Sequence, residues 1–126
     1  MAVDNKYLYS ELTDNIIKAA SKVHKVLGPG LVEKLYQRAL KIELARNGIK
    51  CEREKKIEMH YGGINIGFDK IDFDVDNKVL VELKAVSDLN EIHKAQMISY
   101  LKSSGRKVGL VINFAKRSLE IKRIIN

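Results

Sequence analysis

The chain has 126 residues, of which 45% are hydrophobic and 31% are charged, the size and composition of one globular domain. Its single cysteine, Cys51, excludes an internal disulfide, and one cysteine with three scattered histidines makes a structural zinc site hard to build. The N-terminal residues lack the apolar segment of a signal peptide, and no stretch reaches the length of a membrane span. We therefore expect a single domain over residues 1–126, located in the reducing cytoplasm.

Positive charge is concentrated near the end of the chain. Lys and Arg number 23 against 16 Asp and Glu, which gives a net charge of +7. Residues 102–126 contain seven basic residues and one acid, whereas the first 101 residues carry 16 basic and 15 acidic ones. A basic end on a neutral body favours binding to the phosphates of nucleic acid, although many small basic proteins only have a solvated basic surface.

Two helices are expected at the start of the chain. Apolar residues recur at three- and four-residue spacing over residues 8–26, and Gly28-Pro29-Gly30 ends this helix because proline cannot continue one. The same periodicity predicts a second helix over residues 31–47, with Asn47 and Gly48 at its C-terminal cap.

The rest of the chain has the pattern of strands with one more helix. The expected elements are strands over 51–61, 64–75 and 79–85, a helix over 88–103 with Asp88 as N-cap or first-turn acid, and a strand over 108–114. Gly62-Gly63 and residues 76–78 are turn signals, and residues 118–125 fit either a strand or a short helix. This order predicts an α/β (α+β) fold with a mixed sheet of four to five strands flanked by helices.

Two of these strands bring carboxylates together. Asp72 and Asp74 alternate with Ile71, Phe73 and Val75, so the alternation predicts that the acids share one face and the apolar residues the other. A hairpin centred on Asn77 places Asp72 opposite Glu82, with Cβ atoms about 4.5–5.5 Å apart. Carboxylates this close repel unless a positive charge lies between them. Lys84 could supply it, and Mg²⁺ or Mn²⁺ suits paired oxygen ligands better.

A polar strand face exposed to water would also explain an arbitrary pair of this kind. The strand over 79–85, however, is apolar at nearly every other position, which brings Glu82 and Lys84 to the margin of the core. Unpaired charges there cost several kcal/mol. We therefore interpret the two charges as part of a site.

Further polar residues are candidates for the same site. His93, Gln96 and Tyr100 share one face of the third helix, where glutamine and tyrosine could bond phosphate oxygens or orient water. The same pattern would also arise if Gln96 were only a surface residue of the helix and Tyr100 only a core aromatic. Glu33, in the first turn of the second helix, suits either a site or the helix dipole, and His24 by itself fits a helix surface.

The ordered set of motifs resembles a known family. Asp72, followed after nine residues by Glu82-Leu83-Lys84, is similar to the PD-(D/E)xK nuclease superfamily, and the segment from Gly30 through Glu33 to Tyr36 reads GxxExxY. The chain thus resembles the small GxxExxY family within that superfamily, over residues 10–125. The residue before Asp72 is Ile71, where the superfamily's motif has proline.

The resemblance implies an αβββαβ core and a metal-dependent nuclease that hydrolyses phosphodiester bonds, with DNA as the expected substrate. It implies that Asp72 and Glu82 bind Mg²⁺ or Mn²⁺, with the Leu83 carbonyl and Glu33 as further ligands. It also implies that Lys84 positions or activates the attacking water or stabilises the charge that develops on phosphate.

The same resemblance implies roles for three more residues. Gln96 and Tyr100 match a QxxxY element that supports the site and contacts DNA, and His24 matches a histidine found upstream in some members. Two other functions stay open: a nucleic-acid-binding or regulatory module of the same fold that does not cut, and an unrelated interaction domain with an accidental motif. The intact acids and Lys84 favour the enzyme. A chain this short leaves little room for target recognition, so we expect weak sequence specificity, a homodimer or a protein partner.

Overall fold

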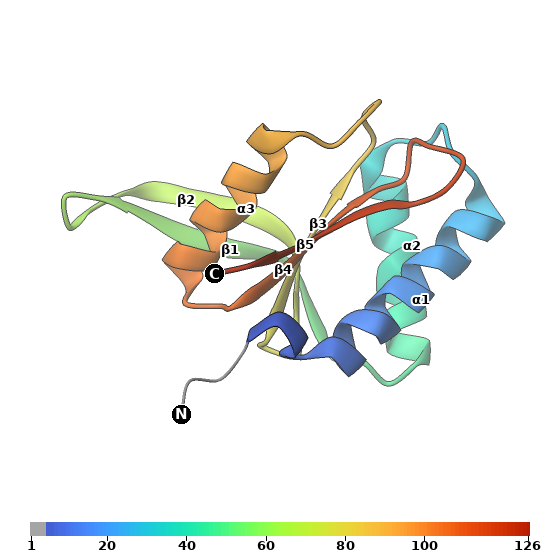
Figure 1. Cartoon of the computed structure of the whole chain (residues 1–126), viewed down its shortest axis with the longest axis horizontal. Helices are drawn as coiled ribbons and strands as arrows, with labels where there is room; N and C mark the ends of the chain where they lie inside the picture. The colour runs from blue at the N-terminus through green and yellow to red at the C-terminus, as the bar shows by residue number, and fades with distance from the viewer. Residues whose placement is uncertain (1–4) are drawn as a thin grey trace.

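A twisted five-stranded sheet organises the chain, and its strands lie in sequence order, β1-β2-β3-β4-β5 (Figure 1). The computed structural model describes residues 5–126. The expectation about a signal peptide concerns the N-terminal segment, of which residues 1–4 lie outside the described residues. The elements are η1 (Asn5–Tyr7), α1 (Ser10–Leu27), α2 (Glu33–Arg46), β1 (Cys51–Tyr61), β2 (Ile64–Val75), β3 (Val79–Lys84), α3 (Glu91–Ser104), β4 (Val108–Asn113) and β5 (Glu120–Ile125).

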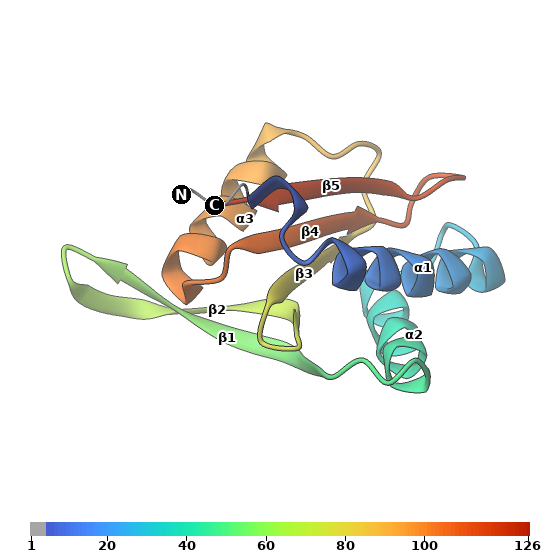
Figure 2. The same cartoon turned by 60° about the horizontal axis from the view of Figure 1, so that its bottom comes forward.

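The sheet is mixed because one pair of strands is parallel. β3 and β4 run parallel, with α3 as the connection between them, and all the other neighbours are antiparallel (Figure 2). The predicted mixed sheet and αβββαβ core are therefore confirmed. The undecided segment near the C-terminus is an edge strand, β5, antiparallel to β4.

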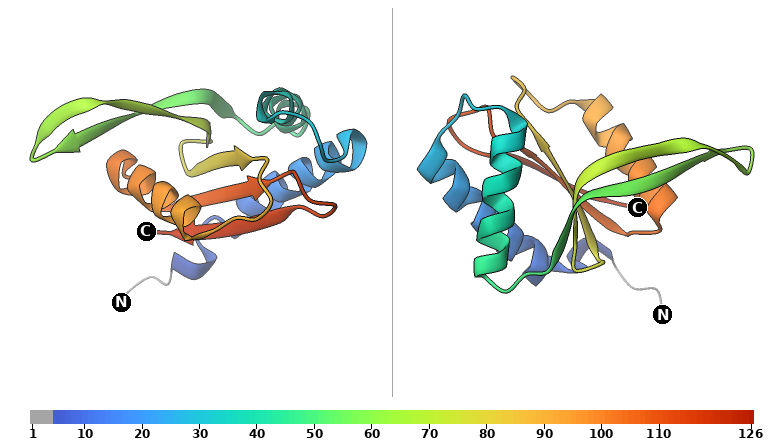
Figure 3. Two further views of the ribbon diagram at one scale, coloured as in Figure 1. Left: turned by 90° about the horizontal axis from the view of Figure 1, so that it is seen from above. Right: turned by 180° about the vertical axis from the view of Figure 1, so that it is seen from behind.

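Helices cover both faces of the sheet, while the hairpin of β1 and β2 extends beyond it (Figure 3). The α1–α2 core includes Ile16, Ala20, Tyr36, Leu40, Phe73, Val81, Leu110 and Phe114. The α3 core includes Ile57, Ile71, Leu80, Met97, Leu101 and Val111. Since β4 contributes to both cores, its nearly continuous apolar sequence is explained by burial on both faces. Cys51 packs against the α1–α2 core as a small apolar side chain.

Two local expectations are wrong. Asp88 does not cap α3: Asn90 does, its side chain accepting from the N–H groups of Ile92 and His93, while Asp88 forms an ion pair with Lys116. In β2, Ile71 packs in the α3 core whereas Phe73 and Val75 pack in the α1–α2 core, so the three do not share one face.

The change of face in β2 falls at Asp72. Across the ladder, between the pairs Arg53↔Phe73 and Lys55↔Ile71, Glu54 has a φ of 56°, which interrupts the extended backbone of β1. Strict alternation therefore fails at this point of the hairpin. Among residues 5–126 we find no helix with the length and apolar character required to cross a membrane.

Part of the basic C-terminal segment is used internally. Arg106 donates to both carboxylate oxygens of Asp74, at 2.8 and 3.2 Å, and Arg123 donates to the Thr13 hydroxyl and to the Leu8 carbonyl, the latter at 2.5 Å. Lys116 pairs with Asp88 at 2.6 Å. The two arginines stabilise the fold through partly buried contacts, and all three positive charges contribute less to any surface for phosphates because each already has an internal partner.

The Arg106–Asp74 pair gives a test of the fold. The Asp74 side chain is only 1% exposed, so Arg106→Ala leaves a buried carboxylate unpaired and should lower the free energy of unfolding by about 3 kcal/mol, measured by urea denaturation. Lys107→Ala, a neighbouring exposed position, is the control and should change it by less than about 0.5 kcal/mol. Equal effects of the two substitutions would contradict the assignment.

Candidate functional site

Asp72 and Glu82 face each other across β2 and β3. The register pairs Phe73 with Val81 and Asp74 with Leu80, and its continuation places Asp72 beside Glu82. The contact is direct, because the Asp72 N–H donates to Glu82 Oε1 at 3.2 Å. The predicted position of the two carboxylates on adjoining strands is therefore confirmed.

Both carboxylate oxygens of Asp72 are held by donors from different elements. Oδ2 accepts from the main-chain N–H of Leu83 in β3, and Oδ1 accepts from Nε2 of Gln37 in α2, both at 2.7 Å. Each oxygen accepts one of these bonds and has another lone pair available for a ligand. Gln37 was not among the residues predicted from the sequence, although its position four residues after Glu33, on the same face of the helix, is a signal that could have identified it.

Burial makes Glu82 a weak acid. Loss of solvent around the side chain, with the adjacent Asp72 carboxylate as the next cause, raises the pKa of Glu82 to about 9, while Lys84 opposes the shift. Glu82 therefore carries a proton at neutral pH when no cation is present. A divalent cation would displace that proton, because metal ligands of this kind bind as carboxylates.

Lys84, Gln96 and Tyr100 surround one small hollow with Glu82, between β3, β4 and α3, and this hollow is too narrow to admit a water molecule. Gln96 and Tyr100 therefore lie on the same face of α3, as their spacing predicts, and His93 borders the same hollow. Tyr100 is itself in the α3 core and donates to Asp69 Oδ2 at 2.6 Å. Burial and this bond raise the pKa of Tyr100, so it acts as a hydrogen-bond donor. Asp69 was not predicted, since nothing in the sequence links it to Tyr100.

Glu33 lies at the start of α2 and reaches the end of β3. Its Oε2 accepts from the Ala85 N–H at 2.9 Å, one residue beyond Lys84. Tyr36 fixes the turn before this helix: its hydroxyl donates to the Gly28 carbonyl at 2.6 Å and accepts from the Leu31 N–H at 3.1 Å. The GxxExxY segment therefore has a clear structural role, in which the tyrosine anchors the loop and the glutamate connects the helix to the sheet.

His24 lies apart from the carboxylate pair. It is 8% exposed, and its Nε2 donates to the Lys116 carbonyl at 2.8 Å. Its ring lies 6.0 Å from that of Phe114, whose N–H donates to the Lys84 carbonyl at 2.9 Å. The contact of His24 with the carboxyl end of β3 is thus indirect, through Phe114.

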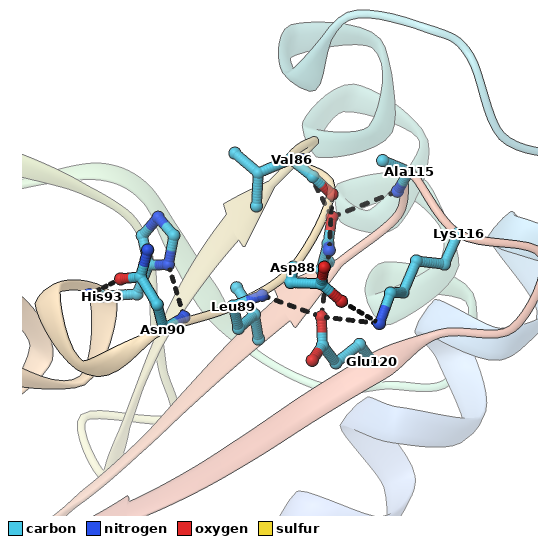
Figure 4. A network of polar contacts seen from close by, with 9 residues as sticks. Val86, Asp88, Leu89, Asn90, His93, Ala115, Lys116 and Glu120 are labelled. Atoms are coloured by element: carbon cyan, nitrogen blue, oxygen red, sulfur yellow. Dashed lines mark hydrogen bonds and ion pairs between the residues drawn. The ribbon is translucent and has the colours of Figure 1, made fainter.

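A polar network fixes the segment that connects β3 to α3 (Figure 4). The side chain of Asn113 is fully buried; it donates to the Val86 carbonyl at 2.8 Å and accepts from the Val86 N–H at 3.1 Å. Glu120 accepts from the Leu89 N–H at 3.0 Å and from Asn113 at 3.1 Å. These bonds hold residues 85–89 against the end of β4, and so fix the position of α3 relative to Lys84.

The carboxylate pair fits a divalent cation of the Mg²⁺ type. Such an ion is commonly held by one or two carboxylates, with water in its other positions. No third His, Cys, Asp or Glu side chain groups with Asp72 and Glu82 within residues 5–126, so Glu33 is not clustered with them. In the same part of the chain no ion pair joins Lys84 to either acid. Two adjoining carboxyl groups without a paired cation are the donor set that a hard cation prefers.

The mixed sheet with its αβββαβ core and paired acids on β2 and β3 defines a restriction-endonuclease-like α+β protein. A family model, that of the PD-(D/E)XK nuclease superfamily, matches residues 10–124. The chain belongs to this superfamily, whose members act on nucleic acid and generally use divalent metal ions.

A solved structure shares this fold. The crystal structure of SSO0001 is similar with a TM-score of 0.58 and 20% sequence identity; the match covers 96% of this chain and 60% of that one. An alkaline exonuclease from Laribacter hongkongensis matches with a TM-score of 0.43 and 13% identity, over 85% of this chain and 76% of that one. A comparison with curated proteins gave no match.

The weak acidity of Glu82 predicts a pH-dependent stability for the metal-free chain. Because the folded-state pKa of about 9 exceeds the ordinary value of 4.5, this group stabilises the fold fully below pH 4.5, and that contribution is lost as the pH rises through 9. Between pH 6 and 8 the wild type should lose up to about 1.4 kcal/mol of unfolding free energy per pH unit relative to Glu82→Gln. Urea denaturation in EDTA measures this difference. Parallel pH dependences for the two proteins would show that Glu82 titrates normally.

Proposed function

We propose that the chain is a metal-dependent nuclease of the GxxExxY type that hydrolyses phosphodiester bonds of DNA with low sequence specificity. The contact between Asp72 and Glu82 is the observation that carries the proposal, since it puts two metal-binding groups on adjoining strands with Lys84 two residues further on. Membership of a nuclease superfamily supports a nucleic acid as the substrate. With its one cysteine a free thiol, the chain is suited to the cytoplasm.

In the proposed reaction, Asp72 and Glu82 hold Mg²⁺ or Mn²⁺, with the Leu83 carbonyl as a further oxygen ligand. When bound, the ion would lower the pKa of a water molecule and neutralise charge on the phosphate. Lys84 lies at the hollow beside Glu82 and adds positive charge where the phosphate gains negative charge. On binding of the cation, Glu82 would lose the proton that it carries in the metal-free protein, and that proton would pass to solvent.

The other predicted residues take different parts in this proposal. Gln96 lies beside Glu82 and Lys84, and its amide group has the donors and the acceptor to bond a phosphate oxygen or to orient water. Glu33 holds the end of β3 through Ala85, and Tyr100 holds Asp69 of β2. We assign both as positioning residues, and His24 as a residue that supports the loop after β4.

The DNA backbone would be held by basic side chains that the fold leaves exposed. Of the C-terminal basic residues, these are Lys102, Lys107, Arg117 and Lys122. They are suited to phosphates, which carry no sequence information directly. Selection of particular targets would then come from a homodimer or a partner protein.

Titration with Mg²⁺ and Mn²⁺ by calorimetry, beside cleavage of plasmid, single-stranded DNA and RNA, tests the proposal. Asp72→Ala and Glu82→Gln should weaken metal binding by at least tenfold and reduce cleavage to background, because each removes one of two acidic ligands. Lys84→Met should still bind the ion but cut at least a hundredfold more slowly, because it removes only the positive charge beside the phosphate.

Glu58→Gln is the matched control, since Glu58 is an exposed acid on β1 of the same hairpin. It should bind metal and cut DNA like the wild type. Metal binding without cleavage of any substrate would instead indicate a regulatory module of the same fold, or a missing partner. Absence of metal binding, with and without DNA, would contradict the metal-site assignment.

A further inference from the structure

Gln37 has a buried polar atom that the fold leaves unsatisfied. The residue is 2% exposed, and its Nε2 donates to Asp72 Oδ1 at 2.7 Å. Its Oε1, on the same planar amide, is buried without a hydrogen-bond partner, and no other buried side-chain nitrogen or oxygen within residues 5–126 is in that position. Buried polar groups are nearly always paired, so an exception in a well-bonded structure requires an explanation.

The orientation of this amide is determined by its neighbour. Turning the group over would put Oε1 against the carboxylate oxygen of Asp72, where two acceptors would repel each other. The bond to Asp72 therefore fixes the unpaired oxygen where it is. An unsatisfied buried acceptor lowers stability, so Gln37 is not the side chain that stability alone would select at this position.

We propose that Gln37 is a positioning residue of the carboxylate pair, which holds Asp72 through Nε2 and offers Oε1 to a donor that enters with the cation. This inference rests on the proposed metal site. A hydrated divalent cation carries water molecules into its site, and each is a hydrogen-bond donor. Groups that orient a ligating carboxylate commonly affect metal affinity by 10- to 100-fold, in order of magnitude.

If Gln37 has this role, replacing it should weaken Mn²⁺ binding without lowering the stability of the metal-free protein. Gln37→Leu keeps much of the side-chain volume, removes the unsatisfied oxygen and deprives Asp72 of one donor. Asp72 is half-buried, so water can replace that bond, and the metal-free protein should unfold at the same urea concentration as the wild type or a higher one. The dissociation constant for Mn²⁺ should nevertheless rise about tenfold or more.

The experiment is calorimetric titration with Mn²⁺ in the absence of nucleic acid, together with urea denaturation in EDTA. Thr13→Val is the matched control: Thr13 is another buried polar side chain on a helix, 2% exposed, but it bonds Ser10 and Arg123. This nearly isosteric change should lower the urea midpoint and leave the Mn²⁺ dissociation constant within about twofold of the wild-type value.

The outcomes separate this inference from the proposed function. Weaker Mn²⁺ binding by Gln37→Leu at unchanged or raised stability supports it. Wild-type binding by the variant overturns it and leaves the metal site intact. A loss of stability parallel to the loss of binding also overturns it, because the residue would then be structural. Failure of the wild type to bind Mn²⁺ overturns both the proposed metal site and this role of Gln37.

Discussion

The site depends on keeping two carboxyl groups in contact that would otherwise repel. Asp72 and Glu82 are brought together by the pairing of β2 and β3, which the apolar side chains on both sides of the sheet enforce. Three features reduce the repulsion: the Leu83 N–H, the Gln37 amide and a proton on Glu82, whose pKa is raised to about 9. The folded sheet thus holds two acidic groups close together at one place, where binding of a cation would relieve their repulsion.

Elements distant in sequence converge on the carboxyl end of β3. α2 contributes Glu33 to the Ala85 N–H, and the loop after β4 contributes the Phe114 N–H to the Lys84 carbonyl. On the other side, Asn113 binds both main-chain groups of Val86. Residues 84–86 are therefore bonded from two directions, and this rigidity can hold the lysine and the acids in a fixed relation. The GxxExxY segment serves the same purpose, since Tyr36 anchors the loop from which Glu33 begins α2.

Local chemistry was sufficient to predict most elements and the central pair of acids. Gly28-Pro29-Gly30 follows the end of α1 and Gly62-Gly63 follows the end of β1, as predicted, because the turn conformations of glycine and proline act within a few residues. The Asp72–Glu82 juxtaposition follows from a period of two and a short turn at Asp76 and Asn77, both with positive φ. The undecided C-terminal segment became a strand only because β4 offers it an edge to pair with. Its short sequence has no preference strong enough to decide this alone.

The sequence by itself therefore determined most of the elements, the turn that sets Asp72 opposite Glu82, and the position of Lys84 two residues further on, since all of these follow from local periodicity and turn chemistry. Tertiary structure alone decided which side chains serve those acids. Gln37 reaches Asp72 across 35 positions of the chain and Tyr100 reaches Asp69 across 31; such contacts depend on how helices pack on a twisted sheet, which no local pattern records. The same holds for Arg106, whose charge suggested a nucleic-acid surface until the fold paired it with the buried Asp74.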